Sequence, residues 1–143
     1  MFNYTDVLET IEMVEREHLD IRTVTMGISL LPCIRATAEE TARCVYDTVC
    51  KKAENIVKVT ADLSAESGIP IVNKRVSVTP VSLIAAPFAD KAALIGRALD
   101  DAAKELGIDF LGGYSALVHK GMADYERTFI RGVPQVLAST ERL

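Results

Sequence analysis

The chain has 143 residues, a net charge of −4 at pH 7 and a composition that is 49% hydrophobic. This length suits one domain with a sizeable core, so we expect residues 1–143 to form a single domain. The acidic balance argues against nucleic acid as a partner, because phosphate neutralisation needs clustered lysine and arginine. No apolar run is long enough to cross a bilayer, and MFNYTDVLETIE has no signal-peptide pattern. We therefore expect a cytoplasmic protein without a membrane partner.

The first half of the chain predicts a helix, a strand and a second helix. Residues 6–19 have apolar residues at helical spacing, with Asp6 placed like an N-cap. Residues 21–31 alternate between apolar and small polar side chains, which predicts a strand. Residues 37–66 predict a long helix, and its length favours a kink near residues 51–52.

The second half continues the alternation. It predicts a strand over 72–79 whose strand-forming residues run on to 84, and a helix over 91–106. It also predicts a third strand over 108–117 and a final helix over 124–140 with a break at 132–134. Strands separated by helices favour parallel pairing with right-handed crossovers, so the predicted fold class is α/β.

The three cysteines, Cys33, Cys44 and Cys50, are an odd number without a CxxC spacing. This predicts neither a disulfide framework nor a zinc site, and we expect no metal. Cys44 and Cys50 fall in a helical pattern, which is typical of partly buried thiols. Cys33 follows a strand, where a buried inert thiol is commoner than a reactive one.

Each predicted strand carries small or polar side chains on one face and apolar ones on the other. Parallel strands covered on both faces are usually apolar on both. The pattern therefore predicts either a polar interior, as in a barrel or half-barrel, or a second face open to solvent, and the small size of these residues favours the interior. The polar sets are Thr23, Thr25, Gly27 and Ser29; Asn73, Arg75, Ser77 and Thr79; and Asp109, Gly113 and Ser115 with Leu111 among them, opposite Phe110.

Arg75 is the most informative residue of this polar face. Its guanidinium can clamp a carboxylate or phosphate, but a structural ion pair with Asp109 explains it equally well. The chain has no recognised catalytic motif, so the catalytic residues, the reaction and any cofactor stay open. The predicted ligand-binding residues are Thr25, Asn73, Arg75, Ser77, Thr79, Gly112, Gly113 and Ser115.

Four stretches resemble a known family: DIRTVTMGISLLPCI, AESGIPIVNKRVSVTPVSLI, LDDAAKELGIDFLGGYSALVHKG and GVPQVLAST. They closely resemble the N-terminal portion of the UPF0210 (DUF711) family of uncharacterised proteins, over essentially the whole chain. The resemblance implies the pyruvate formate-lyase-like group, an α/β barrel of two half-barrels, of which this chain would be a half-barrel fragment. It implies no established activity and no glycyl radical.

Members of that family are considerably longer, and this chain ends at STERL, where the next strand is expected. We expect an expressed fragment, a truncated reading frame or one component of a split protein. An unpaired strand edge invites pairing with another chain, so we expect a homo-oligomer or a complex with the remainder of a split barrel. The expected function is binding of a small anionic metabolite, by an enzyme or a non-catalytic regulatory module. The alternative is a structural module that is completed by oligomerisation.

Overall fold

The computed structural model describes residues 3–17 and 20–143. They include a parallel three-stranded sheet in the order β1-β2-β3, formed by β1 (Ile21–Ile28), β2 (Ile71–Val78) and β3 (Phe110–Gly112). Helices separate the strands along the chain, which confirms the predicted α/β class. The helices are α1 (Tyr4–Ile11), α2 (Ala38–Ala53), α3 (Ile56–Ser67), α4 (Val81–Ala85), α5 (Ala93–Leu106) and α6 (Asp124–Leu137).

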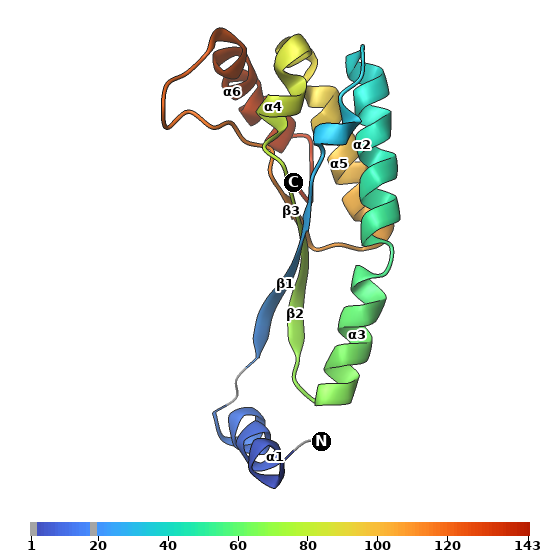
Figure 1. Ribbon diagram of the computed structural model, residues 1–143, viewed down its shortest axis with the longest axis vertical. Helices are drawn as coiled ribbons and strands as arrows, with labels where there is room; N and C mark the ends of the chain where they lie inside the picture. The colour runs from blue at the N-terminus through green and yellow to red at the C-terminus, as the bar shows by residue number, and fades with distance from the viewer. Residues whose placement is uncertain (1–2, 18–19) are drawn as a thin grey trace.

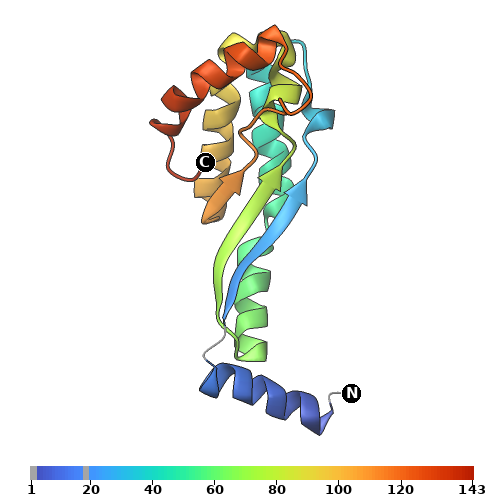
Figure 2. The same ribbon diagram turned by 90° about the vertical axis from the view of Figure 1, so that its left-hand side faces the viewer.

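The sheet has one covered face and one open face. Helices α2, α3 and α5 lie on the same side of the strands (Figure 1), and Figure 2 looks onto the opposite side. The core fills the space between the strands and the helices, because apolar side chains of the three strands and of α2 to α6 point there. Its large members include Ile28, Val76, Val78, Leu111, Val45, Val49, Ile95, Leu99 and Phe129.

The N-terminal helix begins earlier than its sequence predicts. It starts at Tyr4, so Asp6 is its third residue, and the Asp6 carboxylate accepts a hydrogen bond from the Asn3 N–H at 3.3 Å. The prediction of Asp6 as the N-cap is therefore wrong by one turn. A π-helical segment, Glu12–Arg16, follows, and residues 18–19 of the predicted helix lie outside the described residues.

The long helix predicted over 37–66 consists of two helices. The Thr37 side chain accepts a hydrogen bond from the Glu40 N–H at 3.1 Å and so caps α2. The helical hydrogen-bond pattern stops at residues 54–55, a few residues beyond the predicted kink, and α3 restarts it. Gly68 ends α3 in the left-handed conformation, with φ of 72°, because glycine adopts it without a Cβ penalty.

Three predicted boundaries are wrong. Strand β2 stops at Val78 and Val81 begins α4, because Pro80 between them has no N–H for the ladder. Strand β3 stops at Gly112, since Gly113 has a φ of 124° that no regular strand adopts. Helix α6 is not broken: it continues through Pro134, whose carbonyl still accepts from the Ala138 N–H at 3.0 Å.

The two faces of β3 are the reverse of those predicted. Leu111 pairs with Val76 and is fully buried on the helix side, whereas Phe110 pairs with Arg75 and is 44% exposed on the open side. The polar set predicted for this strand therefore does not share the face of Arg75. The register of β3 depends on where the chain that leaves α5 meets β2. The alternation of residues within the strand does not reveal this.

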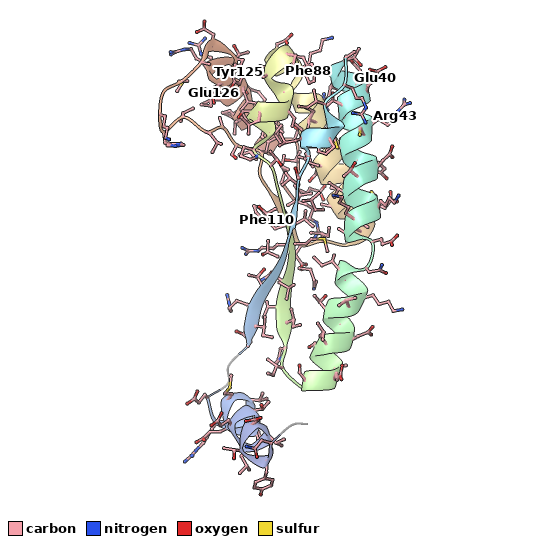
Figure 3. The ribbon with its side chains drawn as sticks, viewed as in Figure 1. Glu40, Arg43, Phe88, Phe110, Tyr125 and Glu126 are labelled. Carbon is pink, nitrogen blue, oxygen red and sulfur yellow. The ribbon has the colours of Figure 1, made fainter. Side chains whose placement is uncertain are left out.

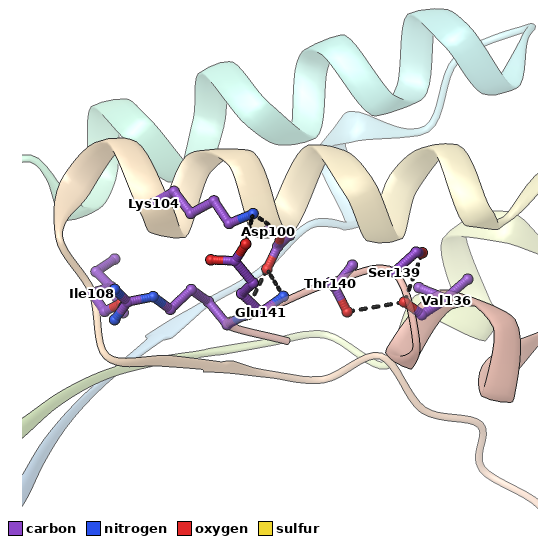
Figure 4. Close-up of polar contacts among 8 residues, drawn as sticks. Asp100, Lys104, Ile108, Val136, Ser139, Thr140 and Glu141 are labelled. Carbon is purple, nitrogen blue, oxygen red and sulfur yellow. Dashed lines mark hydrogen bonds and ion pairs between the residues drawn. The ribbon is translucent and has the colours of Figure 1, made fainter.

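A buried carboxylate fixes the segment that follows α6. Asp100 of α5 is 3% exposed, and its Oδ1 accepts hydrogen bonds from the N–H groups of Glu141 and Arg142 at 2.9 and 2.7 Å (Figure 4). The Nζ atom of Lys104 lies 3.0 Å from Asp100 Oδ2. The Arg142 carbonyl in turn accepts from the Leu111 N–H at 2.7 Å. This segment is thereby held against β3.

None of the helices in the described part of the chain is both long and apolar enough to cross a membrane.

Candidate functional site

The candidate site lies on the open face of the sheet, at the level where all three strands are present. Thr25 pairs with Arg75, and Arg75 pairs with Phe110, so these three side chains form one row across the sheet. The Arg75 guanidinium lies 5.6 Å from the centre of the Phe110 ring, which is within cation–π range. Figure 3 shows Phe110 on the side of the strands away from α2 and α3.

The next row along the strands is nearly flat. Ser77 pairs with Gly27 on one side and with Gly112 on the other, so a single hydroxyl stands between two glycines. A Cβ placed on Gly27 would meet no atom within 4 Å. The backbone of this row is therefore accessible beside the Arg75 row.

Arg75 does not form the structural ion pair that was its alternative explanation. Asp109 Oδ2 instead lies 3.2 Å from Lys74 Nζ and accepts the Lys74 N–H at 2.7 Å. The hydrogen bond from the Lys74 N–H, helped by the Lys74 ammonium, lowers the pKa of Asp109. Lys74 points to the helix side, as its position in the strand predicts, and in the described structure no carboxylate lies within ion-pair distance of Arg75.

The other predicted ligand-binding residues already have structural partners. Asn73 donates to the Arg22 carbonyl at 2.9 Å, and Thr79 Oγ1 accepts from the Leu30 N–H at 3.1 Å. Gly113 lies against the Val78 backbone, and the Ser115 carbonyl accepts from the Ser82 N–H at 3.2 Å. These four residues hold the strand ends together. In the part of the chain that the structure describes, the side chains of Thr25, Arg75 and Ser77 make no hydrogen bond, and with Gly112 they form the remaining part of the predicted site.

Phe110 is not among the residues predicted for the site. Its place beside Arg75 follows only from the register of β3, and an apolar residue in a predicted strand gives no separate signal. With it, the face offers a guanidinium, an aromatic ring and hydroxyls, which suits an anion with an attached flat or apolar group. Over the described residues, no three His, Cys, Asp or Glu side chains gather closely enough to hold a metal ion.

Two of the three cysteines have thiols of high pKa. Burial raises the pKa of Cys33 above its ordinary value of 9.0, although a hydrogen bond with Thr48 opposes the effect. Burial likewise raises the pKa of Cys50, although a hydrogen bond with Tyr46 opposes it. Both thiols are therefore protonated at neutral pH, as expected for the packed thiols that the sequence predicts.

The comparison with known proteins identifies the family. A family model described as "Uncharacterised ACR (DUF711)" matches residues 12–143. The chain belongs to this DUF711 family. A UPF0210 protein of Thermoanaerobacter sp. (strain X514) is 51% identical over 99% of the chain, and one of Ligilactobacillus salivarius (strain UCC118) is 54% identical over 94%. The resemblance found in the sequence is thus confirmed.

The DUF711 relatives are much longer than this chain. The alignments cover 32% of the Thermoanaerobacter protein and 30% of the Ligilactobacillus protein. The chain therefore spans about a third of the length of the curated relatives that it matches. Their names state no substrate or activity.

Proposed function

We propose that the open sheet face of this DUF711 chain binds a small anionic metabolite in the cytoplasm. Arg75 holds the anion, and Thr25, Ser77 and Phe110 line the site around it. In the longer relatives the remaining two thirds of the chain cover this face, as the interior of a pyruvate formate-lyase-like barrel. Because the described residues of this face include no acid–base pair, we propose binding as the primary role, with any reaction depending on residues from the rest of the protein.

The observation that carries the proposal is the guanidinium of Arg75, which has no carboxylate partner among residues 3–17 and 20–143. If the rest of the longer protein covers this sheet face, the guanidinium on it needs an opposite charge, since burial of an unpaired charge is costly. Lys74 already neutralises Asp109 on the other face. An anionic ligand is the simplest partner for Arg75, and the planar fork favours a carboxylate or a phosphate.

The test uses thermal unfolding of the longer Thermoanaerobacter relative with citrate, succinate or inorganic phosphate as probes. We expect at least one of these anions to raise its Tm. Where the relative carries arginine at the position aligned with Arg75, its replacement by alanine should weaken binding by about 10- to 100-fold, the value of one hydrogen-bonded charge. Lysine at that position should restore little, because it keeps the charge but loses the bidentate geometry.

The matched control removes another arginine from the same sheet. Arg22 lies on β1 and faces the side of the sheet opposite to Thr23 and Thr25. Its side chain is 80% exposed. Alanine at the position aligned with Arg22 should leave the effect of the anion unchanged. The proposal is wrong if no probe shifts the Tm of the relative, or if both alanine variants respond equally.

A second candidate function is a structural module that is completed by a second copy of the chain. The observation behind it is helix α1, which contains no buried residue and stands away from the sheet (Figure 1). Its apolar residues recur at helical spacing and form one exposed stripe that a partner can cover. The stripe consists of Tyr4, Val7, Leu8 and Ile11.

We therefore expect the 143-residue protein to be a dimer or larger oligomer in light scattering. Leu8→Lys places a charge in the stripe and should shift the population toward the monomer. Thr5→Lys adds the same charge beside the stripe and should not. A wild-type protein that is monomeric at micromolar concentration would exclude this candidate.

A further inference from the structure

We propose that Cys44 and Cys33 form a redox-active pair, in which Cys44 reacts with a low-molecular-weight disulfide and Cys33 then closes an intramolecular disulfide. The proposal concerns the turn between β1 and α2 and is independent of the ligand proposed for the sheet. It rests on the contact between the two cysteines, the arginine that faces Cys44, and the cavity onto which Cys44 opens.

The two cysteines are in contact although they are 11 positions apart. Cys33 ends a short 3-10 turn, Leu31–Cys33, and is 1% exposed. Its Sγ lies 3.6 Å from the Cys44 carbonyl oxygen and 3.3 Å from the Thr48 hydroxyl. Both cysteines are free thiols in this structure. Because the two residues are neighbours, we infer that rotation about their side-chain bonds brings the two sulfur atoms together for a disulfide. Such a rotation is a smaller change than movement of a backbone segment.

Arg35 distinguishes Cys44 from the other thiols. Its Nη1 donates to the carbonyl oxygens of Pro32 and Ile34, both at 2.8 Å, and these bonds fix the guanidinium. Its Nη2 donates to the Cys44 Sγ at 3.2 Å. Cys44 is thus the thiol that a fixed guanidinium contacts, and this cation attracts an anionic disulfide such as oxidised glutathione to the Cys44 sulfur.

Cys44 also opens onto the surface. A cavity of about 420 Å³ is lined by Arg35, Glu40, Arg43, Cys44 and Asp47. Figure 3 shows Glu40 and Arg43 near the end of α2 that follows this turn. The cavity gives a small disulfide a route to Cys44, whereas Cys33 beneath it has no such access.

The reaction balances as two thiol–disulfide exchanges. The Cys44 thiolate attacks one sulfur of the small disulfide, that S–S bond breaks, and the first thiol leaves with a proton. The Cys33 sulfur, after losing its proton, attacks the Cys44 sulfur, and the second small thiol leaves. The two protein thiols are thereby oxidised by two electrons, and the small disulfide is reduced to two thiols.

The order of the two steps follows from access. Burial is the largest cause of the raised Cys33 pKa, and the hydrogen bond and charge of Cys44 add to it. Cys33 is 1% exposed and does not line the cavity, so a small disulfide reaches Cys44 first. Cys33 then reacts with the sulfur of the neighbouring Cys44.

The experiment treats the reduced 143-residue protein with oxidised glutathione at neutral pH, quenches with acid and maps peptides without reduction. We expect a protein lighter by two hydrogen atoms, with the Cys33 and Cys44 peptides joined. Cys33→Ala should stop at one glutathione on Cys44. Arg35→Gln should slow the first step by about 10-fold, because the anionic glutathione disulfide is attracted less strongly, and Arg35→Lys should recover part of the rate. Circular dichroism checks that each variant is folded.

Cys50→Ser is the matched control and should form the disulfide at the wild-type rate, because Cys50 lies outside the cavity lining. The proposal is overturned if Cys50 reacts before Cys44 in the folded protein. It is also overturned if the folded protein does not react at Cys44 under conditions in which the urea-unfolded chain reacts at all its cysteines.

Discussion

Replacement of Gly113 by alanine should lower the free energy of unfolding by about 4 kcal/mol, from backbone strain and overpacking together. Gly113 has a φ of 124°, which side chains rarely adopt. A Cβ at this position would also lie 2.6 Å from both the carbonyl oxygen and the Cγ2 of Val78. The oxygen belongs to the backbone of the central strand and cannot move aside without disturbing the sheet. Urea unfolding followed by circular dichroism measures the change.

Gly27→Ala is the control for this prediction. Gly27 lies in β1 without a positive φ, and a Cβ there would meet no atom within 4 Å. The same chemical change should therefore alter the free energy of unfolding by less than about 1 kcal/mol, because it acts mainly on the unfolded chain. Equal destabilisation by the two substitutions would show that neither the φ nor the contact with Val78 constrains Gly113.

Asp100→Ala should lower the free energy of unfolding by about 3 kcal/mol. Hydrogen bonds to a charged group are strong, and their loss leaves partly buried donors without a partner. The donors are the N–H groups of Glu141 and Arg142, which Asp100 Oδ1 accepts together. Asp101→Ala is the control, since Asp101 is exposed on the same helix. We expect little change in the free energy of unfolding for the control. Similar losses in both variants would contradict the role of Asp100.

The contribution of Asp100 should depend on pH. Burial alone would raise its pKa, but hydrogen bonds from Arg142, Lys104 and Glu141 outweigh burial and lower the pKa below the ordinary 3.8. The unfolded chain then takes up the proton first, so the stabilisation is present above about pH 4 and is lost as the pH falls through the lowered pKa. The difference in unfolding free energy between wild type and Asp100→Ala should shrink over that acidic range.

The parts of the fold that the sequence predicts are those determined locally. Alternation of side chains places β1, and apolar residues at helical spacing place α2 and α3, because each signal involves residues that are close in the chain. Strand β3 could not be predicted in the same way. Its short paired segment and its facing depend on contacts with β2, about 35 positions earlier in the chain. The break expected at Pro134 is wrong because tertiary packing of α6 outweighs one missing hydrogen bond.

The residues of the site also differ in whether local sequence patterns could place them. The alternation in β1 and β2 correctly places Thr25, Arg75 and Ser77 on one face, since residues two positions apart share a face in any strand. The strand pattern does not reveal that Asn73 and Thr79 bind backbone atoms instead, nor that Phe110 joins the face. The contact between Cys33 and Cys44 also depends on how the turn folds onto α2, so the absence of a CxxC spacing gave no hint of it.

The register of the sheet has a consequence for how the molecule fluctuates. Strand β3 pairs only with residues 75–77 of β2, so the sheet has two strands over residues 71–74 and three over residues 75–77. Local opening is easier where fewer strands and less core hold the backbone. Arg75 therefore stands at the boundary between a rigid part and a looser part of the sheet. A ligand that bridges Thr25, Arg75 and Phe110 would damp the motion of the two-stranded part and draw its affinity partly from the conformational entropy of that ribbon.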